Sequence, residues 1–192
     1  MEMNRCGWCG TDELYCQYHD TEWGVPVFDD QKLFETLILE TFQAGLSWIT
    51  VLRKREAFRK AFLNFDPEKM AIMNENSVFE LMQDPGIIRN SAKIKAAVNN
   101  AKIYLKMQDS GKQLGQFLWQ FTDGKTLLNE YSSLRELPSK TPLSDSISKE
   151  LKGLGFTFMG STVVYAHMQA TGMVNDHLIS CFRHRELINY SR

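Results

Sequence analysis

Helical periodicity runs through most of this chain and constrains its fold more than any other feature. Apolar residues recur every three or four positions in segments that start at capping residues and stop at glycine. Strand signals are few, and Phe156-Thr157-Phe158 is too short to support a sheet. The sequence predicts one all-α domain over residues 1–192, with the two ends, 1–25 and 172–192, packed together as a small terminal lobe.

Each expected helix is marked by a residue that can cap its start, a proline in its first turn or a glycine at its end. The ends of the chain carry no long helix, and residues 122–141 are expected to form a loop. The expected helices are 31–42 capped by Asp30, 48–62 capped by Ser47, one starting at Asp66-Pro67, one from Ser77 to Gln83, one from Ser91 to near Gly111, 114–121, one from Ser144 or Asp145 to Leu154, and one from Ser161 to about Thr171.

Composition limits the size of the core and the cellular environment. The 192 residues are 43% hydrophobic and include 12 Phe and 4 Trp, so a sizeable core can form without disulfide bonds. No apolar run approaches the roughly 20 residues of a membrane span, and no signal peptide is visible. We therefore expect a cytoplasmic protein with reduced cysteines and no membrane contact. The net charge of -1 does not exclude nucleic acid, because a basic face can lie on a neutral protein.

Two cysteines and two histidines at opposite ends of the chain form a possible metal site. Cys6 and His19 flank a short N-terminal segment, while His177 and Cys181 are four positions apart, the spacing of one helical turn. A Cys₂His₂ set is a common tetrahedral zinc site, and a metal there would tie the two ends together. From spacing alone, scattered thiols and surface histidines are the more frequent explanation.

The segment Cys6-Gly7-Trp8-Cys9 offers a rival chemistry, since its CxxC spacing is that of a thioredoxin-type redox motif. That motif normally lies in a strand–helix context, which the surrounding residues do not show. Cys9 could instead compete for a metal position. Cys16 is interpreted as a packing residue.

The chain also contains longer strings with a specific order and spacing. They are Arg5-Cys6-Gly7-Trp8, Tyr18-His19-Asp20, Glu22-Trp23-Gly24-Val25-Pro26, Glu40, Gln43-Ala44-Gly45-Leu46-Ser47-Trp48-Ile49-Thr50-Val51-Leu52, Gly86-Ile87-Ile88-Arg89-Asn90 and Val174-Asn175-Asp176-His177. Over nearly the whole chain, these strings resemble the 3-methyladenine DNA glycosylase I family. The resemblance implies an all-helical fold of the helix-hairpin-helix DNA glycosylase superfamily. It also implies a structural zinc bound by Cys6, His19, His177 and Cys181.

The function implied by the resemblance is DNA repair. Such an enzyme hydrolyses the glycosidic bond of 3-methyladenine in alkylated double-stranded DNA after flipping the nucleotide out of the helix, and it releases 3-methyladenine without a lyase step. The aspartate that assists many enzymes of the superfamily is absent after the expected hairpin, because Asp109 lies too far along the helix. We expect the enzyme to act as a monomer.

Glu40 is the expected catalytic residue. It borders the apolar face formed by Leu33 and Leu37, near the C-terminal end of its helix, where a negative charge is disfavoured. A carboxylate in an apolar setting is costly unless it meets a cation or hydrogen-bond donors, and 3-methyladenine in DNA is a cation. Glu40 would then favour this base over adenine and stabilise an oxocarbenium-like transition state. A solvated surface glutamate is the simpler alternative.

Aromatic side chains are expected to form the base pocket. By the resemblance, Tyr18 and Glu40 contact the base edge and Trp48 stacks on the base. Trp8 and Tyr15 are further candidates by residue type. For each aromatic, a place in the core is the alternative. Trp48 differs from the others because it follows a tight turn between two helices.

A turn between two helices at Pro85-Gly86-Ile87-Ile88-Arg89 is the expected DNA-binding hairpin. Such a turn can direct backbone N–H groups at a phosphate, although a Pro-Gly turn alone is more often just a helix stop. The charged run Arg53-Lys54-Arg55 is interpreted as a solvated face. The expected DNA contacts are Gly86, Ile88, Arg89 and Lys93, with Leu46 as a wedge into the base stack.

One departure from the family pattern and one alternative function remain to be considered. In the family a serine often follows the tyrosine at position 165, whereas this chain has Ala166-His167, so one polar contact in the pocket is missing unless His167 supplies it. The chain could also be a zinc-stapled, non-enzymatic nucleic-acid-binding module. Such a module would have no need for Glu40 beside Trp48.

Overall fold

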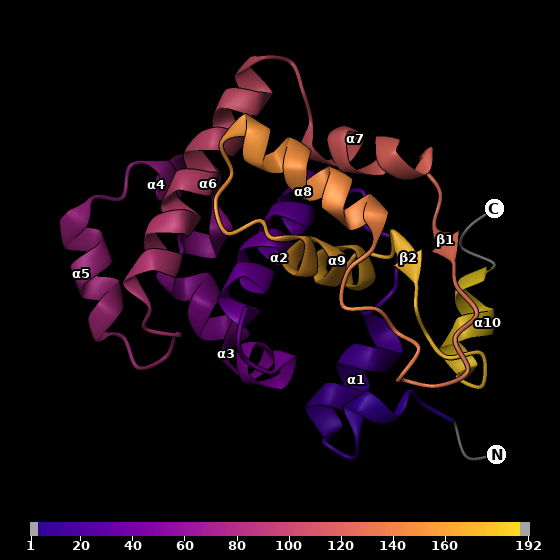
Figure 1. The fold of residues 1–192 in the computed structure, drawn as a ribbon. Coiled ribbons are helices and arrows are strands. Elements are labelled where there is room, and N and C mark those ends of the chain that lie inside the picture. The colour runs from indigo at the N-terminus through magenta and orange to yellow at the C-terminus, as the bar shows by residue number, and fades with distance from the viewer. Residues whose placement is uncertain (1–3, 189–192) are drawn as a thin grey trace.

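Helix α2 (Asp30–Gln43) lies at the centre of the fold, and the other helices are arranged around it (Figure 1). Its apolar side chains, among them Leu33, Phe34 and Leu37, are fully buried. The computed structural model describes residues 4–188. The helices that pack against α2 are α3 (Trp48–Ala61), α6 (Ser91–Asp109), α7 (Leu114–Trp119) and α9 (Ser161–Ala170).

Residues that follow α3 form a second group of helices, which rests on α6 (Figure 1). A run of phenylalanine rings, with neighbouring centroids 4.6 to 6.1 Å apart, joins this group to α2. No helix in the described part of the chain is long and apolar enough to cross a membrane. The elements of this group are η2 (Leu63–Phe65), α4 (Pro67–Ala71) and α5 (Glu75–Gln83). Outside the group, η3 (Gln120–Thr122) packs on α7, and α8 (Pro142–Leu154) packs on α9.

The two ends of the described chain meet on one side of the molecule (Figure 1). The backbone N–H of Phe182 donates to the carbonyl of Asn4 at 3.0 Å, and the side chain of Asn4 donates to the carbonyl of Ser180 at 2.8 Å. The elements of this region are η1 (Gly7–Cys9), α1 (Glu13–Thr21), β1 (Leu127–Leu128), β2 (Val174–Asn175) and α10 (Phe182–Ile188).

Several of these short elements were not predicted. Helices α1 and α10 have nine and seven residues, too few for a clear period, and helices of that length depend on tertiary contacts. The parallel pair of β1 with β2 lies partly in the expected loop, 122–141, and Phe156-Thr157-Phe158 is not a strand. The pairing joins segments far apart in sequence, which no local pattern could indicate.

The helix starts expected at Ser77 and at Ser144 or Asp145 were placed too late, whereas those expected at Ser47, Ser91 and Ser161 agree with the structure. Ser77 and Ser144 are the third residues of capping boxes, in which Asn74 and Thr141 are the caps. A serine at this position bonds back to the N–H of the cap, so both residues carry the sequence signal of a helix start.

The start of α2 differs from the prediction by one residue. Asp29 is the cap, and Asp30 is the first helical residue. The carboxylate of Asp30 accepts hydrogen bonds from the N–H groups of Leu114 at 3.0 Å and Gly115 at 2.8 Å. Asp30 therefore satisfies the first N–H groups of α7, and it links this helix to α2.

Gly172 lies where the end of α9 presses on the loop that leads to α2, and it has a left-handed φ of +71°. A Cβ there would lie 2.5 Å from backbone atoms of Val25 and Pro26. We expect Gly172→Ala to lower the free energy of unfolding by more than about 3 kcal/mol. Gly111→Ala is the matched control, because Gly111 has a similar φ of +78° with open space around it; its cost should be about 1 kcal/mol. Equal losses in urea denaturation would contradict the close approach at Gly172.

Candidate active site

An aromatic cavity of about 180 Å³ is enclosed by the N-terminal segment, α2, α3 and α9. An apolar cavity of about 150 Å³ is known to hold a benzene ring, so this one can admit a planar ring. All five residues expected to bind the base, Glu40 among them, line it. The lining residues are Trp8, Tyr15, Tyr18, Trp23, Glu40, Gln43, Trp48, Leu137, Ala166 and Gln169.

The aromatic walls of the cavity support one another through ring contacts. Trp8 lies 4.8 Å from Tyr15 and 5.0 Å from Trp23, centroid to centroid. Tyr18 lies 5.5 Å from Trp48, tilted by 41°. The sequence left open whether each aromatic residue lies in the core or in the pocket. These rings do both, because they are buried or partly buried in the core and also line the cavity. Trp48 holds its place as the first residue of α3, directly after the α2–α3 turn.

Glu40 was expected at the border of an apolar face, and the structure shows it almost fully buried. It is 3% exposed, and its Oε2 has no hydrogen-bond partner in the described part of the chain. Burial raises the pKa of Glu40 to about 8. The carboxyl group is therefore mostly neutral at pH 7 while the cavity holds no cation.

Four lining residues were not proposed from sequence, and two of them had a usable signal. Trp23 lies within the quoted string 22–26. Gln43 follows Glu40 by three residues in α2, so these two side chains share a helix face. Leu137 and Gln169 come from distant segments, and only the tertiary fold brings them to the cavity.

Gln169 is held by a buried carboxylate. Its side-chain amide donates to Asp176 at 2.7 Å, and Asp176 also accepts a hydrogen bond of 2.6 Å from the hydroxyl of Tyr165. Ala166 lines the cavity one turn away, but His167 does not. His167 is fully buried, and burial lowers its pKa to about 3. It therefore does not replace the missing serine, whereas Gln169 offers a carbonyl oxygen as acceptor.

The four residues expected to bind a metal do lie together. Their ligand atoms are all within 4.8 Å of one another, and all four side chains are buried. Sγ of Cys181 lies 3.5 Å from Nε2 of His19 and 3.6 Å from Nδ1 of His177, and Sγ of Cys6 lies 3.6 Å from the same Nδ1. The helical-turn argument for one pair was wrong, because His177 and Cys181 precede α10 in an irregular segment.

The ligand atoms of this cluster face one another, and two of them also accept backbone hydrogen bonds: Nε2 of His19 from the N–H of Cys6 at 3.2 Å, and Sγ of Cys6 from the N–H of Leu178 at 3.4 Å. His19 donates through Nδ1 to Asp20 at 2.8 Å, and His177 donates through Nε2 to the carbonyl of Trp23 at 3.0 Å. Both histidines thus turn their other nitrogen toward the cysteines, as metal-binding histidines do. Hydrogen bonding from Cys6 and from both histidines lowers the pKa of Cys181, which favours its thiolate. These groups could hold one metal ion.

Cys9 takes no part in the cluster, although it shares the CxxC segment with Cys6. Its thiol donates instead to the carbonyl of Cys6 at 3.1 Å, and burial raises its pKa to about 11. A raised thiol pKa disfavours the thiolate that redox catalysis requires. Cys16 is partly buried and lies outside the cluster, and its role as a packing residue stays a prediction.

The expected DNA-contacting turns are both accessible. Leu46 is 44% exposed and follows Gly45, whose φ is +82°. Arg89 is exposed and forms no ion pair within residues 4–188. The N–H of Gly86 is taken by Asp84 at 2.7 Å, so the hairpin amides without a partner there are those of Ile88 and Arg89.

Lys93 does not fit a phosphate-binding role. It is 7% exposed, and its ammonium group donates to the carbonyls of Phe42 at 2.9 Å and Ala44 at 2.6 Å. The sequence showed its charge but not that α6 turns it inward. The phosphate contact at Lys93 stays a prediction, and this inward position does not support it.

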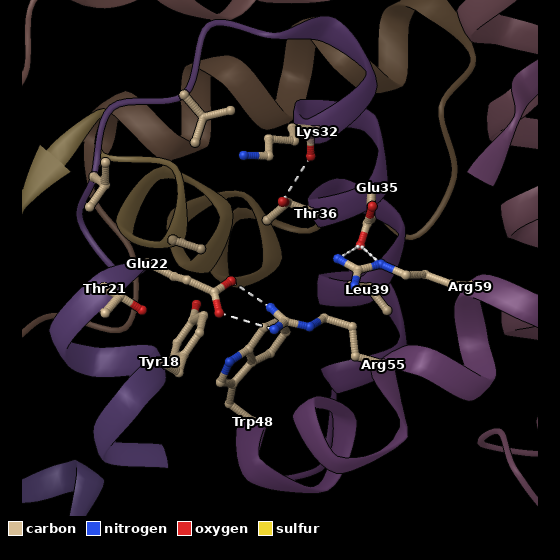
Figure 2. A pocket seen from close by; sticks show the side chains of 13 residues that line it. Tyr18, Thr21, Glu22, Lys32, Glu35, Thr36, Leu39, Trp48, Arg55 and Arg59 are labelled. Carbon is tan, nitrogen blue, oxygen red and sulfur yellow. Dashed lines mark hydrogen bonds and ion pairs between the residues drawn. The ribbon is translucent and has the colours of Figure 1, made fainter. Parts of the chain in front are cut away.

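A second, smaller cavity of about 150 Å³ lies behind Tyr18 and Trp48, and it contains two arginine–carboxylate pairs (Figure 2). Arg55 binds both oxygens of Glu22, at 2.5 and 3.0 Å, and Arg59 donates to Glu35. These pairs connect α3 to α1 and α2. The solvated face predicted for the run 53–55 was wrong for Arg55, which is half-buried, and holds for Arg53, which is exposed.

Comparison with known proteins places this architecture in a family. The methyladenine glycosylase family model matches residues 8–184. DNA-3-methyladenine glycosylase 1 of Escherichia coli (strain K12) is 50% identical over 179 residues, 93% of this chain and 96% of that protein. A crystal structure of 3-methyladenine DNA glycosylase I matches with a TM-score of 0.92 and 49% identity, covering 93% of this chain and 98% of the other.

A further match is the crystal structure of a 3-methyladenine DNA glycosylase I variant in complex with 3-methyladenine. Its TM-score is 0.89 at 37% identity, and the match covers 94% of this chain and 97% of the other. The matched range includes every residue that lines the cavity, both turns and three of the four cluster residues, while Cys6 lies two residues before it. This chain therefore belongs to the methyladenine glycosylase family.

Proposed function

We propose that this protein is a monofunctional DNA N-glycosylase that removes 3-methyladenine from alkylated double-stranded DNA. The observation that carries the proposal is Glu40, a buried carboxyl group with an unpartnered oxygen in an aromatic cavity that can admit a planar ring. A relative is named for this activity, and a matching structure holds 3-methyladenine. We expect the enzyme to act as a monomer on DNA in the cytoplasm.

Charge would be the basis of selectivity. In the free protein Glu40 is mostly protonated near neutral pH, because burial raises its pKa to about 8. A flipped 3-methyladenine nucleotide brings a positive charge that stabilises the carboxylate, so Glu40 loses its proton as the base enters. Normal adenine is neutral and offers no such compensation. Tyr18 and Trp48 would enclose the base from its edge and face.

The reaction would be a hydrolysis. Water attacks C1′ of the sugar while the bond to the base breaks; the base leaves with the bonding electrons as neutral 3-methyladenine, and one proton of the water goes to solvent. The carboxylate of Glu40 stabilises the positive charge that develops on the sugar. Among the described residues that line the cavity, Glu40 is the only one with a carboxylate, and none is a lysine. This lining supports hydrolysis without a Schiff base.

The DNA would bind across both accessible turns. The turn between α5 and α6 would act as the hairpin of a helix-hairpin-helix motif, with the free amides of Ile88 and Arg89 directed at a phosphate and the charge of Arg89 added to them. Gly86 keeps the hairpin backbone close to α3. Leu46 would enter the space that the flipped nucleotide leaves.

The terminal cluster would hold a structural zinc ion. Zinc bonds of about 2.3 Å to sulfur and about 2.0 Å to nitrogen at tetrahedral angles separate the ligand atoms by about 3.6 Å. The closest distances among Cys6, His19, His177 and Cys181, 3.5 and 3.6 Å, fit this geometry. Such an ion would fix the two ends of the chain.

Replacing Glu40 by glutamine tests the electrostatic role. We expect Glu40→Gln to lower the single-turnover rate of 3-methyladenine release from alkylated DNA by at least about 100-fold, because the negative charge is lost while the shape is kept. Glu150→Gln, at an exposed glutamate of α8, is the control and should match wild type. If wild type binds DNA but releases no base, the proposed function is wrong. If Glu40→Gln is fully active, only the role of Glu40 is wrong.

Stability should depend on pH through the same residue. The folded-state pKa of Glu40 is raised, so folding loses stability as pH rises from the unfolded value near 4.5 through about 8. The shift corresponds to a penalty on the order of 5 kcal/mol above pH 8. We expect Glu40→Gln to unfold like wild type at pH 4 and to be clearly more stable at pH 9. The same difference at both pH values would show that Glu40 ionises normally.

Removal of the metal should weaken both the fold and the pocket. Purified protein should contain one zinc per chain, and Cys181→Ala should lose it and more than about 3 kcal/mol of unfolding free energy. Tryptophan fluorescence should change as well, because Trp8 packs on His19 and Trp23 on His177. Cys9→Ala is the matched control and should keep its zinc. Loss of metal in this control would assign a ligand role to Cys9.

A further inference from the structure

The two accessible turns are each followed by a helix, and each helix reaches the other turn. Residues 44–47, which include Leu46, lead into α3, and residues 84–90 lead into α6. One lysine of α6 contacts the first turn, and one lysine of α3 contacts the second. The helix after each turn thus contacts the other turn, although the two turns are far apart in sequence.

Lys93, the third residue of α6, contacts the end of α2 and the turn that follows. Its ammonium group donates to the carbonyls of Phe42 and Ala44 at 2.9 and 2.6 Å. Carbonyls at a helix C-terminus lack intrahelical donors, and the helix dipole favours a cation there. Lys93 therefore fixes the backbone that carries Leu46.

Lys54, on α3, contacts the hairpin in the same way. Its ammonium group donates to the carbonyls of Pro85 at 2.7 Å and Gly86 at 3.3 Å. One turn further along α3, Ala57 lies so close that a Cβ on Gly86 would be 3.0 Å from the Ala57 Cβ. The hairpin backbone is thus packed directly on α3.

We propose that Lys54 and Lys93 form a reciprocal brace that holds the α2–α3 turn and the α5–α6 hairpin as one rigid DNA-binding surface. Both are positioning residues, because they act through backbone carbonyls rather than on DNA. The inference rests on the proposed function, in which the hairpin binds a phosphate and Leu46 enters the base stack. A fixed spacing between the turns lets phosphate binding place Leu46 against the base stack.

Salt dependence separates a brace from a phosphate contact. A lysine that neutralises a phosphate adds about 0.9 to the slope of log affinity against log salt concentration. A lysine bonded to carbonyls adds nothing to that slope. Methionine keeps the length of lysine without its charge. Lys106→Met is the matched control, since Lys106 is an exposed lysine in the last turn of α6, whereas the hairpin precedes the first turn of that helix.

The experiment compares wild type, Lys54→Met, Lys93→Met, the double variant and Lys106→Met. Amide hydrogen exchange reports on each turn through the N–H of Leu46, bonded to the Gln43 carbonyl, and the N–H of Gly86, bonded to Asp84. Duplex affinity across a salt series and single-turnover base release are measured on the same proteins. Tryptophan fluorescence gives the affinity for free 3-methyladenine.

We expect a crossed pattern, in which each variant loosens the turn its lysine contacts. Lys93→Met should speed exchange at Leu46, and Lys54→Met should speed exchange at Gly86, each by at least about tenfold. Base release should fall about tenfold in either single variant and little further in the double variant, because both break one unit. The salt slope and the affinity for the free base should stay at the values of wild type and Lys106→Met.

A slope that falls by about one per lysine, with unchanged exchange, would overturn the brace and make Lys54 and Lys93 phosphate contacts. Unchanged exchange and unchanged base release would also overturn it. If wild type releases no base, the proposed function fails, while the exchange pattern still tests the brace. If Lys93→Met does not fold, Lys54→Met alone decides, because the Lys54 side chain lies nearer the surface.

Discussion

The site depends on a carboxyl group that the fold buries without a full set of partners. Glu40 lies on α2, which is fixed at both ends: Asp30 binds the first amides of α7, and the carbonyls of Phe42 and Ala44 accept hydrogen bonds from Lys93. These contacts hold the helix in place, with Glu40 3% exposed. Burial favours the protonated form of Glu40 unless a cation lies beside it. The same burial that destabilises the folded protein when Glu40 is ionised therefore favours binding of a positively charged base.

The pocket walls are supported from outside by the ends of the chain. Trp8 and Trp23 lie between the cavity and the terminal cluster, in ring contact with His19 and His177 respectively. On the far side of Tyr18, the pairing of Arg55 with Glu22 ties α1 to α3. The aromatic walls of the cavity are thus supported by ring contacts on one side and by an ion pair on the other.

Much of the site was predictable from local signals, and the rest depended on side-chain direction. The strings around Cys6, Glu40 and Trp48 indicated the cluster and the cavity, and helical periodicity indicated most helices. Sequence could not show that Lys93 turns inward, because a lysine near a hairpin has the same pattern whether it binds a phosphate or a carbonyl. Gln169 was missed for a similar reason, since its place at the cavity depends on Asp176, beyond the end of its helix.

The most direct test is the pKa of Glu40, measured by carbon NMR of its labelled carboxyl group, in the free protein and with an N-alkylated adenine that carries a fixed positive charge. The account predicts a pKa of about 8 without ligand and a value well below 7 with the cation bound. An ordinary pKa near 4.5 in the free protein, unchanged by the cation, would contradict it.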